Sequence, residues 1–146
     1  FEVSHPPIEP ALGYRLDYGG RSVVISGDSL VTDKIVEISD GADVVLHDAM
    51  ELRLVQTAEN VLRNAGVTRN ATVLHDIQDY HATTEDLQRL VDEAEIGLLA
   101  LYHLVPAPRN AMAVGAFNRS IPEGALITED AMVISLPSGS EDILID

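Results

Sequence analysis

Hydrophobic and polar positions along the chain predict strands near its start and a mixture of helices and strands after them. Residues 12–18 alternate roughly between apolar and polar side chains, which is typical of a half-buried strand. A turn at 18–21 contains two glycines and leads into a strongly apolar segment at 22–26, so we expect a β-hairpin. Residues 43–46 and 96–101 are short continuous apolar runs, which indicates central strands buried on both faces.

Helical periodicity is clearest between and around these runs. Apolar residues at helical spacing predict a helix over 52–62, and Gly66 stands where such a helix would end. A second helix is expected from Thr83, because Thr83 stands three residues before Asp86 as in a capping box and a stripe of apolar residues follows. His81 lies just before this helix.

The last third of the chain predicts one more helix, at 110–118, and two strands, at 125–128 and 132–136. The sum is an α/β fold. There is no internal repeat and no linker rich in Pro, Gly or Ser, so we expect residues 1–146 to form a single unit. The chain begins without Met inside an ordinary mixture of residues, and we interpret it as a fragment or a processed half.

Composition narrows the possible functions. The chain has 146 residues, 46% of them apolar, which is enough for a hydrophobic core. Nine Lys and Arg against 24 Asp and Glu give a net charge of −15, which makes nucleic acid an unfavourable partner. No apolar run reaches the roughly 20 residues of a membrane span, and no signal peptide is present, so we expect a cytoplasmic protein without membrane contact.

Polar residues that can bind metals follow the three apolar runs. Asp28, the pair His47 and Asp48, and His103 each come directly after one of them. Because active sites of α/β proteins lie at the carboxyl ends of strands, these side chains are expected on one face. A lone His or Asp there is usually a turn or cap residue, but their joint occurrence in a chain with five His and no Cys favours an imidazole and carboxylate metal site.

Several segments together resemble a known family. The segments are Ser4-His5-Pro6, Ser26-Gly27-Asp28-Ser29, Gly41 to Ala49, His81-Ala82-Thr83 and Leu101-Tyr102-His103. In order and context they are similar to the second half of the ribonuclease Z-like branch of the metallo-β-lactamase superfamily. The resemblance implies the C-terminal half of a four-layer αββα fold, and it covers nearly the whole chain.

The resemblance implies a set of metal ligands. His5 and His103 would each bind one of two divalent metal ions, and Asp28 would bridge the two. Zinc is the expected metal, with manganese or iron as alternatives. The His-x-His-x-Asp-His motif, which supplies the remaining ligands in the family, has no match in this sequence. We therefore expect the N-terminal half of the fold to lie outside this chain, and the chain alone to be inactive.

Two further residues are implied to take part in the reaction. His81 matches the His of the family's His-Ser-Thr loop, with Ala82 in place of Ser, and would protonate the leaving group or hold the scissile group. Asp48 stands where the family has Glu and would orient His81. His47 and His75 are interpreted as packing or loop residues.

These residues predict a metal-dependent hydrolase that attacks an ester with an activated water, its substrate being a phosphodiester, a sulfate ester or a lactone-type small molecule. Its expected partners are that substrate and the missing half of the fold, in a homo-oligomer. A tRNA 3′-end processing endonuclease is the first alternative, although the family's tRNA-binding arm has no room between His5 and Asp28. A non-catalytic interaction module or degenerate half-domain is the second. The third is a GDSL-type serine esterase with Ser29 as nucleophile, because residues 27–30 read Gly-Asp-Ser-Leu.

Overall fold

The structure, a computed structural model, describes all residues from 1 to 146, and its centre is a five-stranded sheet. The strand order is β3-β4-β5-β6-β7. β3 and β4 are antiparallel, whereas β4, β5, β6 and β7 run parallel to one another. The bounds are Tyr14–Tyr18 for β3, Arg21–Ile25 for β4, Val44–Met50 for β5, Leu98–Val105 for β6 and Leu126–Ile127 for β7.

The predicted hairpin is confirmed. β3 and β4 pair from Tyr14 with Ile25 to Tyr18 with Arg21. Gly19 and Gly20 form the connection with φ angles of 59° and 79°, and glycine adopts such angles without a steric penalty. The apolar runs at 43–46 and 96–101 are also confirmed as neighbouring central strands.

Five α-helices and one short 3₁₀ helix connect the strands. The capping box predicted at the start of α4 is present, with Thr83 and Asp86 exchanging hydrogen bonds. Helices α1 and α3 were not expected from the sequence. The bounds are Asp33–Ser39 for α1, Leu52–Asn64 for α2, Thr68–Asp76 for α3, Ile77–Asp79 for η1, Thr84–Glu93 for α4 and Ala111–Ser120 for α5.

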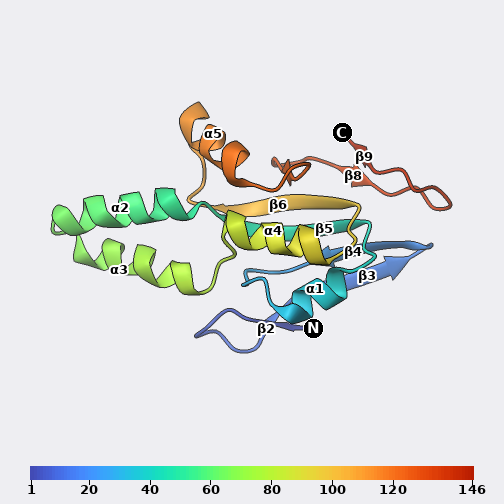
Figure 1. The fold of residues 1–146 in the computed structure, drawn as a ribbon, viewed down its shortest axis with the longest axis horizontal. Coiled ribbons are helices and arrows are strands. Elements are labelled where there is room, and N and C mark those ends of the chain that lie inside the picture. The colour runs from blue at the N-terminus through green and yellow to red at the C-terminus, as the bar shows by residue number, and fades with distance from the viewer.

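The hydrophobic core lies between the sheet and the helices α1, α4 and α5, which cover the same face (Figure 1). Each helix contributes large side chains that are fully buried, Ile35 from α1, Leu87 and Leu90 from α4, and Phe117 from α5. They pack against alternate residues of the three central strands. These strand residues are Val24, Val45, Ala49, Leu99 and Leu101.

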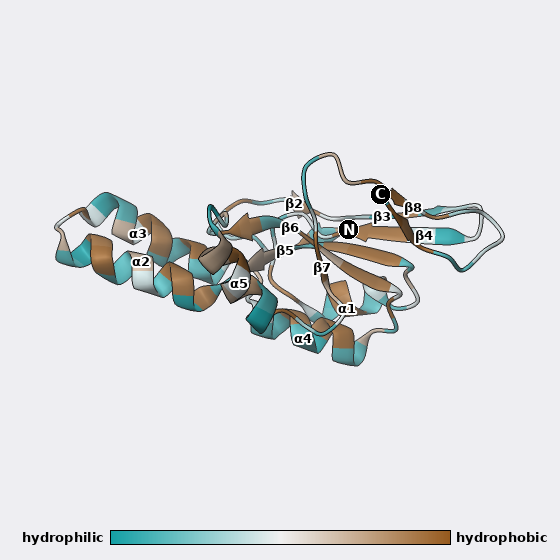
Figure 2. Cartoon of the chain, turned by 90° about the horizontal axis from the view of Figure 1, so that it is seen from above, coloured by the Kyte–Doolittle hydropathy of each residue, from teal (hydrophilic) through white to brown (hydrophobic).

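Helices α2 and α3 extend away from the sheet and pack mainly against each other (Figure 2). α2 starts directly after β5, and Val55 is its one buried residue. α3 buries only Ala71. None of the helices combines the length and the apolar character needed to span a membrane.

Two small strand pairs flank the sheet. β1 (Glu2–Val3) pairs with β2 (Ala11–Leu12), and β8 (Ile134–Ser135) pairs with β9 (Leu144–Ile145). The segment that holds β8 covers part of the sheet face opposite the helices. A fully apolar hollow of about 240 Å³ remains there, lined by Val23, Val44, Leu46, Met132, Ile134 and Leu136.

The prediction of one half-buried strand over 12–18 is wrong in two respects. The strand is interrupted at Gly13, which separates β2 from β3, and all five residues of β3 are exposed. Tyr14 and Leu16 pair with Ile25 and Val23, yet more than half of each side chain is open to solvent, at 58% and 54% exposure. The alternation describes a face that this part of the fold leaves uncovered.

Candidate functional site

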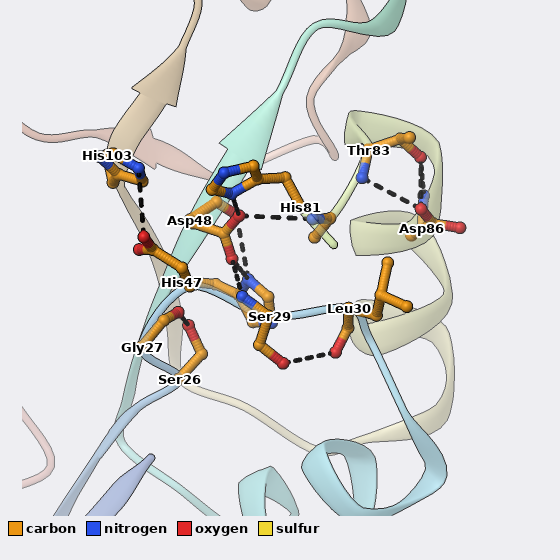
Figure 3. A network of polar contacts seen from close by, with 12 residues as sticks. Ser26, Gly27, Ser29, Leu30, His47, Asp48, His81, Thr83, Asp86 and His103 are labelled. Carbon is orange, nitrogen blue, oxygen red and sulfur yellow. Dashed lines mark hydrogen bonds and ion pairs between the residues drawn. The ribbon is translucent and has the colours of Figure 1, made fainter. Parts of the chain in front are cut away.

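The predicted site residues come from five separate parts of the fold. Figure 3 shows three of them, Asp48, His81 and His103, close together near the ends of two strands. His5 lies between β1 and β2, Asp28 follows β4, and His81 lies between η1 and α4. From the sequence, Asp48 and His103 were expected just after two strands. In the structure they lie within these strands, Asp48 in β5 and His103 in β6.

The turn before Asp28 depends on Gly27. Its φ angle is 69°, and a Cβ atom at this position would lie 2.9 Å from the carbonyl oxygen of Leu12. Any larger residue would be strained by both the backbone conformation and the lack of space. Gly27 therefore allows the chain to leave β4 sharply and to bring the carboxylate of Asp28 to the site.

Asp48 is a fully buried carboxylate with three hydrogen-bond donors from other segments. Its Oδ2 atom lies 2.8 Å from Nδ1 of His81 and accepts the N–H of Ala82, while Oδ1 accepts the N–H of Ser29 at 3.1 Å. His47, fully buried, places Nδ1 3.0 Å from the same Oδ1. Burial raises the pKa of the Asp48 carboxyl, but hydrogen bonds with His47 and His81 outweigh burial and hold the pKa below its ordinary value. The expected contact between Asp48 and His81 is thus made.

His103 occupies a β-bulge. Asp48 pairs with Tyr102 and Ala49 pairs with Leu104, so His103 has no partner in the parallel ladder. Its φ angle is 43°, in the left-handed region that few residues other than glycine adopt. Bulges of this kind redirect a side chain, and here Nε2 of His103 lies 3.3 Å from Oδ2 of Asp28.

The donor set fits a divalent metal ion in its chemistry. One possible ligand atom from each of His5, Asp28 and His81 lies within 4.8 Å of the other two. Imidazole nitrogens with a carboxylate oxygen are ligands that zinc, manganese and iron accept. Asp28 belongs to this cluster and also contacts His103, so its carboxylate lies between the two groups of possible ligands.

His81 lies close enough to His5 and Asp28 to be counted among the possible ligands, whereas His103 lies outside that group and contacts Asp28. The resemblance implied His81 as an acid and His103 as a ligand, and both roles stay predictions. Because Nδ1 of His81 is engaged by Asp48, only Nε2 remains free for a metal or a substrate.

Tyr80 is part of the site, although the sequence did not single it out. Its ring centroid lies 4.5 Å from that of His5 and 5.1 Å from that of His81. Burial, and next the nearby charge of Asp76, raise the pKa of the Tyr80 hydroxyl. The signal that could have found Tyr80 is its place beside His81 in the chain.

Ser29 and His75, both considered in the sequence analysis, do not take part in the cluster. Ser29 is fully buried, and its hydroxyl donates to the carbonyl of Leu30 at 2.8 Å, so no His activates it as a nucleophile. His75 lies on α3, is mostly exposed, and contacts Glu59.

Comparisons with known proteins agree on the family. The ribonuclease Z of Mycobacterium avium is 32% identical over 105 residues, which are 72% of this chain and 34% of that protein. The ribonuclease Z of Mycobacterium tuberculosis H37Rv is 31% identical over 106 residues, again 72% of this chain and 34% of the relative. The chain spans about a third of the length of these curated relatives. No family model matches it.

A solved structure shows the fold. The metallo-β-lactamase fold protein YhfI from Bacillus subtilis superimposes with a TM-score of 0.53 and 18% identity, covering 86% of this chain and 43% of YhfI. The sheet with its single helix layer is therefore the C-terminal half of a four-layer αββα metallo-β-lactamase fold. The curated relatives are named ribonuclease Z, so within that superfamily the chain is similar to the ribonuclease Z-like branch.

Proposed function

We propose that this chain contributes part of the active site of a metal-dependent ester hydrolase. The observation that supports the proposal is the convergence of His5, Asp28 and His81 from three separate segments, with His103 turned toward Asp28 by a bulge. The chain matches about a third of the length of its curated relatives. We therefore assign turnover to the complete protein.

His5, Asp28 and His103 would hold the metal, with Asp28 shared between two ions. Divalent ions bound there would supply Lewis-acid chemistry, generating a nucleophile from water at neutral pH and polarising the ester oxygen. The bulge at His103 and the glycine turn before Asp28 place these two side chains next to each other. Zinc is the metal we propose, since tetrahedral His and carboxylate sets suit it well.

His81 would act on the leaving group. The carboxylate of Asp48 accepts the Nδ1 proton of His81, which fixes the tautomer and the direction of the ring. In its doubly protonated form His81 would also carry a proton on Nε2 and give it to the leaving oxygen, while the carboxylate of Asp48 stabilises the imidazolium. Ala82 and Ser29 donate to the same carboxylate and keep Asp48 in place.

We propose a small ester as the substrate. An RNA phosphodiester is the second candidate. The curated relatives are named ribonuclease Z, which favours an RNA phosphodiester. The net charge of −15 opposes a long polyanionic substrate on the surface of this chain. A phosphodiester of modest size satisfies both observations.

We also propose that the uncovered sheet face is closed by the rest of the fold or by another subunit. Tyr14 and Leu16 of β3 are exposed beside the apolar hollow formed by Val23 and Val44. Apolar sheet faces of this kind are normally covered. A homo-oligomer built around the complete fold is the arrangement we expect.

The test uses the complete protein, purified without chelator. Metal analysis should find zinc, manganese or iron, and the protein should hydrolyse bis(p-nitrophenyl) phosphate. His103→Ala should lower kcat by about 100-fold or more, since loss of a ligand disrupts the centre. His75→Ala, which removes an exposed His, is the matched control and should leave kcat unchanged. Absence of metal together with unchanged hydrolysis in His103→Ala would exclude the proposed function.

A further inference from the structure

A cavity of the chain shares no residue with the metal-ligand cluster but is lined by Thr83, two residues after His81. It has a volume of about 600 Å³ and is enclosed by the first turns of α2 and α4 and the last turn of α5. Figure 1 shows these three helices around the end of β5. Its polar lining consists of Glu51, Arg53, Gln56, Thr83, Thr84, Glu85, Arg119 and Ser120.

The wall of the cavity is joined to the site by backbone contacts. Thr83 lies two residues after His81 and bridges to Met50 of β5. The N–H of Met50 donates to the carbonyl of Ala82 at 2.7 Å. The loop that carries His81 therefore continues directly into the wall of this cavity.

Two arginines of the cavity have no acidic partner. The Arg and Lys residues that form ion pairs with acidic side chains are Arg15, Arg21, Lys34, Arg63 and Arg89. Arg53 and Arg119 take part in none, although the chain has 24 acidic residues. They approach the cavity from α2 and α5, and both are exposed to solvent.

Two carboxylates also line the cavity, and neither forms an ion pair with these arginines. Glu51 is buried and accepts the N–H of Leu54 at 2.7 Å, so this carboxylate caps the start of α2. Glu85 is exposed and forms no ion pair. The two guanidinium groups are therefore free to bind a ligand, with the hydroxyl of Thr84 in the same lining.

We infer that this cavity binds a phosphoryl group, or a similar tetrahedral oxyanion, on the part of the substrate that does not react. A guanidinium group offers a planar fork of N–H donors that matches two oxygens of a phosphate. Two such groups from different helices, with the Thr84 hydroxyl in the same lining, can surround one oxyanion. The assignment of this anion to the substrate rests on the proposed function, whereas the anion site itself does not.

Binding of inorganic phosphate to the metal-free complete protein is the first test. Calorimetry should detect binding, and the amide signals of Thr84 and Ser120 should shift in the NMR spectrum. Arg53→Gln and Arg119→Gln should each weaken phosphate affinity about tenfold. Arg53→Lys should weaken it less, because the charge remains and only the fork is lost. Glu85→Gln should strengthen binding, since it removes the opposing charge.

Arg69→Gln is the matched control, because Arg69 is also unpaired but lies on α3 against a different hollow. It should leave phosphate affinity unchanged. Equal affinity in wild type, Arg53→Gln and Arg119→Gln, or a loss of the same size in Arg69→Gln, would overturn the site. Thermal unfolding of each variant confirms that the fold is retained.

A second experiment connects the cavity to the substrate. The p-nitrophenyl ester of thymidine 5′-phosphate is compared with the same ester carrying an additional 3′-phosphate. The wild-type protein should have a lower KM for the doubly phosphorylated ester, and Arg53→Gln with Arg119→Gln should remove this difference with kcat unchanged. Equal KM values in the wild type would contradict a substrate role. Failure of the wild type to hydrolyse either ester would contradict the proposed function and leave the phosphate-binding result intact.

Discussion

The Nδ1 atom of His81 lies 2.8 Å from Oδ2 of Asp48, and this contact ties the loop before α4 to the interior of β5. Because Asp48 also accepts N–H groups from Ser29 and Ala82, one buried carboxylate fixes three segments that surround the site. Four predictions follow from this arrangement and from its neighbours.

Asp48→Asn should reduce activity more than binding. The amide keeps the volume of the carboxylate, but its NH₂ group must face a donor N–H or the ring of His81, so the orientation of His81 is lost. We expect kcat of the complete protein to fall about 10- to 100-fold with a small change in KM. Steady-state kinetics on bis(p-nitrophenyl) phosphate measure both. Asp92→Asn on the exposed side of α4 is the control. An equal loss of kcat in that variant would contradict a positioning role of Asp48.

Asp28→Asn should lower metal content more than the loss of any single His. Asp28 is a member of the cluster with His5 and His81 and also lies 3.3 Å from His103, so its charge acts on both sides of the site. Inductively coupled plasma mass spectrometry of the complete protein should show less bound metal in Asp28→Asn than in His5→Ala or His103→Ala. Equal metal content in the three variants would mean that Asp28 is not shared.

His103→Gly should be more stable than His103→Ala. Both variants remove the imidazole, but alanine retains a Cβ atom at a φ angle of 43°, which costs about 1 kcal/mol. Chemical unfolding should therefore give a higher free energy of unfolding for the glycine variant by about that amount. The same pair at Leu101, which is buried in the regular part of β6, should show the opposite order. A more stable alanine variant at position 103 would argue against a strained bulge.

Asp43→Asn should destabilise the fold at neutral pH and have little effect in acid. The hydrogen bond from Arg21, followed by that from the Ser22 N–H, holds the pKa of the Asp43 carboxyl below its ordinary value. The stabilisation is therefore complete above the unfolded pKa of about 3.9 and is lost as the pH falls through the lower folded pKa. We expect a loss of about 2 kcal/mol at pH 7, because a buried guanidinium loses its charged partner.

Urea unfolding at several pH values tests this expectation. The difference between wild type and Asp43→Asn should shrink as the pH drops below about 4. Asp17→Asn removes the partner of the more exposed Arg15 and should change the free energy of unfolding by less than about 0.5 kcal/mol at any pH. A difference for Asp43→Asn that persists unchanged at low pH would contradict the assigned cause.

Features encoded by local pattern could be predicted from the sequence. The apolar runs that form β4, β5 and β6, the glycine hairpin and the capping box at Thr83 each depend on residues close together in the chain. The ligand candidates were also identified, because Asp28 and His103 follow apolar runs and His5 and His81 belong to motifs of the family. Their roles as ligands remain predictions.

Features that depend on distant contacts could not be predicted. Helix α3 has one buried residue, Ala71, and therefore no apolar stripe to reveal it. β3 is exposed because no other segment of the chain covers it. The alternation of apolar and polar residues within β3 cannot show whether such a cover exists. The stacking of Tyr80 on His5 joins positions far apart in the sequence and depends on where β1 and η1 are placed by the fold.

The bulge at His103 makes the site dependent on residue count as well as residue type. One extra residue in β6 lets Tyr102 and Leu104 pair with consecutive residues of β5 while the imidazole between them is free of the ladder. A regular ladder at this point would turn the imidazole away from Asp28, so transfer of this centre to another parallel sheet requires the irregularity to be transferred with it.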